Sequence, residues 1–305
     1  MLVGAANVLA KLLFVIFTVV SLVFFAQRLI PGSPADAVFG ADAPEVQKQQ
    51  WLRDNGLDKP IFDQYTTYMV SIAAGDFGRK LVDGKPIGPQ IFKRIPATLT
   101  LAVTAFFVSV FFAFLFGIFA ALRAGSRWDK CLAVLSLIQV SAPVFISGTI
   151  LLWFLAVQWN LLPLTGNDGL KSVLLPAFTL GAVLSAVTSR MIRASLLEVL
   201  NEDYIRTARS KGLSKGRVYL KHALRNALVP VIAVLGLQFA GLLGGTVITE
   251  HVFTWPGLGS LLIEAVNQRD YNLVSACVTV LAFIHVIVSV IVDLLQRLVD
   301  PRMVH

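Results

Sequence analysis

Six long apolar segments, separated by polar stretches, account for most of the chain. They cover residues 8–27, 97–122, 132–158, 174–192, 226–249 and 273–296. About 20 apolar residues are enough for an α-helix to cross the hydrocarbon core of a bilayer. The pattern therefore predicts an all-α membrane protein with six transmembrane helices. The fourth segment is the weakest, because it mixes Ser and Thr with its aliphatic residues.

Composition agrees with a membrane protein. Of the 305 residues, 56% are hydrophobic and only 14% are charged, whereas about a quarter of the residues of a soluble protein are charged. The first apolar segment is too long for a signal peptide, and Arg28–Pro34 after it contains no small-x-small cleavage site. We therefore expect a retained transmembrane helix at the N-terminus.

The positive charges predict the orientation in the membrane. Lys and Arg gather in alternate connections, with three at Arg123, Arg127 and Lys130 and many more between residues 190 and 225. The short connections on the other side carry only Lys171 and Arg269. Because cytoplasmic loops are enriched in Lys and Arg, both termini are expected inside. The net charge of +8 is explained by this topology, and nucleic-acid binding explains it less well.

These patterns divide the chain into four parts. Residues 1–27 form the first transmembrane helix, and residues 28–95 form a small external subdomain with helical pieces near 44–54 and 61–74. Residues 96–297 form a five-helix membrane core whose cytoplasmic loop is 193–225. Residues 298–305 form a cytoplasmic tail.

The cytoplasmic loop predicts two short helices joined at a glycine. Asn201 is expected to cap the first helix, which would run to Lys211 and end at Gly212. A second, basic helix would begin near Ser214. Such a protruding knob suits docking into a groove on another protein. The alternative is a solvated basic loop that touches lipid headgroups.

Motifs of covalent chemistry are missing from the sequence. It contains no GxxxxGK[ST] phosphate loop, no HExxH and no GxSxG, so no catalytic residue is predicted. The cysteines Cys131 and Cys277 have no CxxC partner and are expected to be packing residues. The four histidines are far apart in the sequence, and no metal site is predicted.

Eight stretches, taken together, resemble the permease subunits of binding-protein-dependent ABC importers, in the branch that carries dipeptides, oligopeptides and nickel. In chain order they are Arg28–Pro34, Gly75–Gly78, Arg94–Thr98, Leu162–Pro163 with Leu175–Pro176, Arg206–Leu213, His222–Pro230, Phe253–Gly259 with Arg269–Tyr271, and Asp293–Leu295 with Asp300–Arg302. Two positions depart from the pattern. Arg206 replaces the Glu of the general family's cytoplasmic EAA loop, and Ser289 replaces the branch's usual Asn, which is expected to alter local helix packing.

The resemblance implies the type I ABC importer fold, an inner membrane of a bacterium or archaeon, and transport by alternating access. The implied partners are a second permease, forming a heterodimer, two cytoplasmic ATPases that use ATP and Mg, an external solute-binding protein, and membrane lipid. No cofactor is expected on this chain. The implied docking element for the ATPases is Arg206, Thr207, Ala208, Lys211, Gly212, Leu213 and Ser214.

Other residues are candidates for the path and its outer mouth. Polar side chains within the apolar segments either line the path or join helices by hydrogen bonds; they are Gln139, Ser141, Gln238 and His285. The candidates for the external gate or for contact with the binding protein are Asp76, Phe77, Glu250, His251, Trp255, Pro256 and Asp270. Pro143 and Pro230 are expected to kink their helices.

The cargo predicted first is a short peptide, and the alternatives are nickel or a metal chelate, glutathione, and opine-like solutes. The sequence argues against two other classes of function. An ion-coupled secondary transporter would need buried acids in the spans, where only Asp293 is available. An intramembrane enzyme would need paired catalytic groups at membrane depth.

Overall fold

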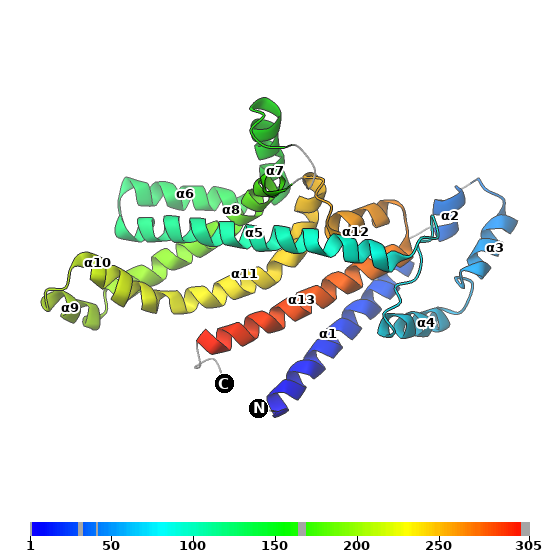
Figure 1. Ribbon diagram of the computed structural model, residues 1–305, viewed down its shortest axis with the longest axis horizontal. Helices are drawn as coiled ribbons and strands as arrows, with labels where there is room; N and C mark the ends of the chain where they lie inside the picture. Colours follow the sequence, from blue (N-terminus) through cyan, green and yellow to red (C-terminus); the bar gives the residue numbers. More distant parts are fainter. Residues whose placement is uncertain (1, 30–32, 41, 164–168, 300–305) are drawn as a thin grey trace. The chain divides into compact units, whose positions relative to one another are not determined.

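The computed structural model describes residues 2–29, 33–40, 42–163 and 169–299, and its regular structure there is almost entirely helical (Figure 1). The backbone forms two compact units. The first consists of Met1–Thr98 with Pro256–Ile287, and the second of Leu99–Trp255 with Val288–His305. The long helices α5 (Ile87–Leu122) and α13 (Tyr271–Val299) each run through both units.

Helices cover all six predicted segments. Four are long and apolar enough to cross a membrane by themselves, namely α5, α8 (Leu170–Leu200), α13, and the helix Val218–Leu242, which joins the π-helical turn η2 (Val218–Ala223) to α11 (Leu224–Val252). The apolar stretch Leu13–Ala26 of α1 (Leu2–Arg28) is shorter than a full span. Six spans therefore stay a prediction.

The third segment is broken. Residues 132–158 are predicted to form one span that Pro143 kinks, and the structure has a full break there. The chain forms α6 (Arg127–Ser141), then α7 (Val144–Leu152) and a π-helical turn η1 (Trp153–Gln158), with a bend of 104° between the two parts. Pro143 lies at this break and explains it. A proline has no N–H to donate, and its ring disfavours helical geometry in the residue before it. The predicted effect of Pro143 is confirmed.

Several helices extend beyond their apolar cores. The expected start of the second span at residue 97 is too late, because α5 begins at Ile87 and passes through Pro96. Gln90, Lys93 and Arg94 interrupt the hydrophobic pattern there and hide this first part of the helix from a hydropathy reading. Likewise α8 continues eight residues beyond the predicted end at 192, to Leu200.

The predicted external segment contains α2 (Pro34–Phe39), α3 (Glu45–Asp54) and α4 (Ile61–Ala73). The helices expected near 44–54 and 61–74 are present, and α2 was not predicted. Ser33 begins α2 with a capping box formed with Asp36. The Lys48 ammonium lies 2.8 Å from the Asp36 carboxylate and joins α3 to α2. This hydrogen-bonded pair holds the pKa of Asp36 below its usual range and raises the pKa of Lys48.

The second unit is built around α8, which packs against α6, α7 and α11. Two glycines also let α8 approach α5 closely. A Cβ atom added to Gly117 of α5 would lie 2.8 Å from the Ser189 carbonyl oxygen on α8, and one added to Gly181 of α8 would lie 2.8 Å from the Ala105 oxygen on α5. Small residues at such crossings let helices in membranes gain packing energy from backbone contact.

Polar contacts fix α8 to its neighbours at two further points. Arg193 donates two hydrogen bonds to Asp129 of α6, at 2.6 and 2.7 Å. The same carboxylate accepts a bond from the Gly125 amide in the turn before α6. On another side, the Thr188 hydroxyl donates to the Gln238 Oε1 on α11 at 2.8 Å. Each bond removes a polar group that lipid could not satisfy.

Gly181→Ala tests the crossing of α5 and α8. We expect a lower melting temperature in detergent, corresponding to about 1–3 kcal/mol of overpacking, because the new methyl group meets backbone that cannot move aside. Gly88→Ala on α5 is the matched control, since its added methyl group would be 3.9 Å from the nearest atom, on Phe77. Equal melting temperatures for Gly181→Ala and the wild type would contradict this account of the crossing.

Candidate functional site

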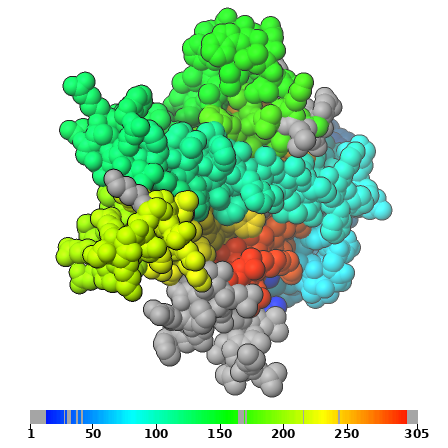
Figure 2. Space-filling model, turned by 60° about the vertical axis from the view of Figure 1, so that its left-hand side comes forward, coloured from blue at the N-terminus to red at the C-terminus, as the bar shows by residue number. Residues whose placement is uncertain are grey.

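The predicted knob is present as two short helical pieces that project from the ends of α8 and α11. They are α9 (Asp203–Ser210) and α10 (Lys215–Arg217), the latter continuing into η2. In Figure 2 the yellow-green and yellow atoms of this region form a distinct protrusion. Gly212 lies between the pieces with φ +77°, in the left-handed region that glycine adopts without steric cost. The prediction that a glycine ends the first helix is confirmed.

The cap of α9 differs from the prediction. Asn201 was expected to cap this helix, but it ends α8, and its side-chain amide donates to the Leu197 carbonyl oxygen at 3.1 Å. Glu202 precedes α9 and makes no side-chain cap bond. The reason is that α8 continues past residue 192 to Leu200, so the side chain of Asn201 bonds to the last turn of α8 and does not cap α9.

A small apolar core holds the knob on the membrane helices. Ile205 and Ala208 of α9 are buried against residues of four other helical segments. These residues are Ala121 of α5, Leu196 of α8, Val218 and Ala223 of η2, and Ala227 of α11. The Tyr204 hydroxyl also accepts a hydrogen bond from the Asn226 amide of α11 at 2.7 Å. A force on the knob is therefore transmitted directly to the ends of α5, α8 and α11.

The predicted coupling residues divide into two sets. Ala208 is buried and Leu213 is half-buried against this core, so they position the knob. The others are exposed and form its outer surface: Arg206, Thr207, Lys211, Gly212 and Ser214. Arg209 is exposed as well, although the sequence reading did not select it. This surface is basic and polar, and its described side chains include one ion pair, the long, exposed contact of Arg206 with Asp203 at 3.5 Å.

The first unit contains a hairpin-like turn at residues 79–86 that the sequence did not predict. Residues Arg79 and Pro86 form an isolated antiparallel bridge, and the Lys80 amide donates to the Lys85 oxygen at 2.9 Å. Asp270 fixes this turn. Its carboxylate accepts bonds from the Leu81 amide at 3.0 Å and from the Leu273 amide in the first turn of α13 at 3.1 Å.

Asp270 is fully buried, which gives this predicted gate residue a clear structural position. Arg269 before it has φ +52°, a left-handed conformation uncommon for a residue with a side chain. This sharp corner between α12 (Leu258–Asn267) and α13 turns the carboxylate back toward both amides. Because Asp270 directly precedes α13, the sequence could have suggested that it caps this helix. Nothing in the sequence indicated its contact with Leu81.

The remaining outer candidates have mixed exposure. Asp76 is exposed and its carboxylate accepts from the Gly78 amide, while Phe77 packs on the cluster around Ile87. Glu250 and Trp255 are buried, and the Trp255 amide donates to the Glu250 backbone oxygen at 2.8 Å. His251 is exposed and Pro256 is half-buried.

The polar candidates for the path differ in their surroundings. Gln238 joins α11 to α8 through Thr188, the helix-joining role that was the alternative reading. Gln139 and Ser141 lie near the end of α6, half-buried and exposed respectively, and His285 is an exposed residue of α13. Among the residues that the structure describes, no three His, Cys, Asp or Glu side chains could hold a metal ion.

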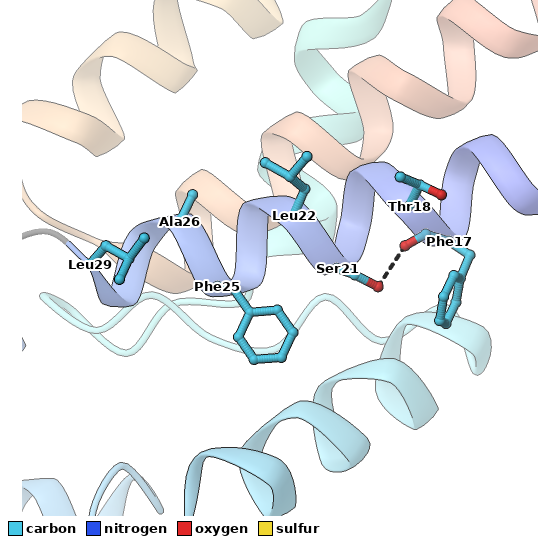
Figure 3. Close-up of a pocket in the computed structure, with 7 residues that line it drawn as sticks. All are labelled: Phe17, Thr18, Ser21, Leu22, Phe25, Ala26 and Leu29. Carbon is cyan, nitrogen blue, oxygen red and sulfur yellow. Dashed lines mark hydrogen bonds between the residues drawn. The ribbon is translucent and has the colours of Figure 1, made fainter.

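A shallow groove of about 480 Å³ runs along the exposed face of α1 (Figure 3). Apolar side chains line most of it, including Phe17, Leu22 and Phe25. Its hydroxyls are occupied by the helix itself, since Ser21 donates to the Phe17 oxygen and Thr18 to the Phe14 oxygen. The groove therefore offers an apolar surface and no evident group for binding a polar solute.

Comparison with known proteins decides the family. The model of the binding-protein-dependent transport system inner membrane component matches residues 113–305, and the model of its N-terminal region matches residues 3–102. This chain belongs to that family. It is the inner-membrane permease subunit of an ABC importer. In such an importer the partner ATPases use the ATP, and a binding protein supplies the solute.

Curated relatives and solved structures agree with this assignment. The permease is 38% identical over 288 residues, 94% of each chain, to the glutathione transport system permease protein GsiC of Escherichia coli K12 and to that of Shigella flexneri serotype 5b. Two solved structures share its fold. One is an amino acid ABC transporter crystallised with histidines, with a TM-score of 0.52 and 19% identity over 70% of this chain and 94% of that one.

The other is the MetNI methionine ABC transporter in inward-facing conformations, with a TM-score of 0.52 and 18% identity over 69% of this chain and 96% of that one. At these identities the two structures establish the architecture of the permease and nothing about its cargo.

Asp270→Ala tests the fixing of the outer turn. The substitution leaves the buried amides of Leu81 and Leu273 without their acceptor, which costs on the order of 1–3 kcal/mol for each. We expect faster hydrogen exchange in residues 78–87, measured by mass spectrometry. Asp58→Ala is the control, because that carboxylate is exposed. Unchanged exchange in Asp270→Ala would show that the turn is held by other contacts.

Proposed function

We propose that this permease forms, with a second and different permease, the path by which short peptides enter the cell, and that glutathione is the first cargo to test. The observation that carries the proposal is the 38% identity over 94% of the chain to a permease named for glutathione transport. Glutathione is itself a tripeptide, so it satisfies the short-peptide prediction. No observation favours nickel, a metal chelate or an opine.

The knob is the proposed docking element for the ATPases. Three observations support this assignment. It projects from the membrane helices, its outer face is basic and polar, and its inner face is packed on α5, α8 and α11. A movement of the ATPases would reach the membrane helices through Ile205 and Ala208. The proposal places both termini and the knob in the cytoplasm, as the distribution of Lys and Arg predicts.

The proposed contacts with the binding protein come from the predicted external segments. Asp76, His251 and Pro256 each have exposed surface that a binding protein could touch. Phe77, Glu250, Trp255 and Asp270 support these residues from partly or fully buried positions. Under this proposal, the buried set determines the shape of the mouth and the exposed set makes the contacts.

Uptake in cells tests the cargo. The complete transporter, with its ATPases, second permease and binding protein, should restore uptake of labelled glutathione to cells that lack their own glutathione importer. Removing only this chain should abolish uptake, because the path is then incomplete. Uptake of labelled dipeptides in place of glutathione would keep the peptide class and change the cargo, whereas uptake of neither would contradict the proposal.

Gly212→Val tests the docking role of the knob. Valine at φ +77° strains the turn by about 1–2 kcal/mol, since β-branched residues rarely adopt left-handed geometry, although the space beside Gly212 is open. We expect less ATPase to co-purify with Gly212→Val, at unchanged membrane insertion. Gly212→Asn is the control, because Asn tolerates this conformation. If Gly212→Val retained its ATPases fully, the docking assignment would fail.

A further inference from the structure

One face of α8 is left open in its second half. Val187, Arg190, Ala194 and Glu198 recur at spacings of three and four residues, so they lie on the same side of the helix, and all four are exposed. The other sides are covered: Thr188 meets α11, Ile192 packs with α5 and α11, and Arg193 meets α6. The open face is therefore a strip on an otherwise surrounded helix.

Arg190 brings a positive charge to this strip, and Glu198 of the same strip lies about two helical turns away. Among the residues that the structure describes, no carboxylate forms an ion pair with it, and no hydrogen bond joins it to another residue. Arg193, one helical turn away, differs from Arg190 because it donates two hydrogen bonds to Asp129. Asp129 is thus already used, and its charge is balanced by Arg193.

Arg190 lies in the half of α8 nearest the knob. It is part of the apolar helix Lys171–Leu200, ten residues before the end, and the predicted topology places it at the cytoplasmic end of the span. An arginine at this level has water, a lipid headgroup or a partner charge as its neighbour. In addition, 61% of the apolar window of α8 is buried, against 33% or less for the other three single spans. This helix is central in its unit, and the strip is its open side.

We propose that Arg190 binds a carboxylate of the peptide cargo as it passes the half of the path nearest the knob. The inference rests on the proposed function, because glutathione and other short peptides carry free carboxylates. A guanidinium can hold a carboxylate through two parallel hydrogen bonds, as Arg193 holds Asp129 in this same helix. Arg190 would therefore favour anionic peptides over neutral ones.

Transport by the complete complex in proteoliposomes provides the first test. Arg190→Gln should lower the rate of glutathione uptake about tenfold at saturating loaded binding protein, the effect of losing one strong charge-assisted hydrogen bond. Arg190→Lys should restore part of the rate. The control is Lys130→Gln on α6, which removes an exposed cation away from the open strip of α8. ATP hydrolysis without cargo should be the same in all variants.

Thiol labelling provides a second test that does not depend on transport. The chain has two cysteines, of which Cys131 is exposed and Cys277 is buried. In a Cys131→Ser background, Arg190→Cys should react in nanodiscs with a charged methanethiosulfonate, which does not enter lipid. S-methylglutathione, which has the carboxylates of glutathione but no thiol, should slow this reaction.

The outcomes separate the inference from the proposed function. Wild-type complex that carries no glutathione contradicts the proposed function, and the labelling still decides whether Arg190 faces the path. Full uptake by Arg190→Gln overturns the inference alone. Reaction of Arg190→Cys only with a lipid-soluble maleimide also overturns it, and would place the side chain among lipid tails. Reaction with the charged reagent that S-methylglutathione does not slow overturns it as well, and would place the side chain among lipid headgroups.

Discussion

The packing of α8 against its neighbours is the constraint on which the larger unit depends. Where α8 crosses α5, Gly117 and Gly181 each face backbone of the other helix at a distance that leaves no room for a side chain. Within a bilayer, apolar surface gains little by leaving lipid for protein, so helices associate through close packing and a few hydrogen bonds. The glycines provide the packing, and the contacts of α8 with Asp129 and Gln238 provide the hydrogen bonds.

This arrangement links the membrane helices to the knob. Ile205 and Ala208 insert into a core that includes the ends of α5, α8 and α11, and Gly212 turns the chain back toward α11. The knob has little apolar surface of its own, so it depends on those three helix ends for its position. An element built in this way is suited to transmit movement, because it cannot shift without moving the helices that hold it.

The first unit uses a different device. Asp270 places one buried carboxylate between two backbone amides that are far apart in sequence, at Leu81 and Leu273. The strained backbone at Arg269 allows this geometry. A single residue thereby fixes both the start of α13 and a turn that precedes α5. Such residues shape an outer surface without being part of it.

The sequence alone determined the class of the protein, because hydrophobic length and the sidedness of positive charge are local properties that one chain displays directly. It also determined the existence of the knob, since Gly212 is a local helix signal, and the role of Pro143 at a break. Tertiary structure decided the rest. The burial of Asp270 and its contact with Leu81 depend on neighbours distant in sequence. The size of the bend between α6 and α7, 104°, and the use of Asn201 by α8 depend on where each helix ends. Arg190 and Arg193 look alike in the sequence, and only the fold shows that one is paired with Asp129 while the other faces an open strip.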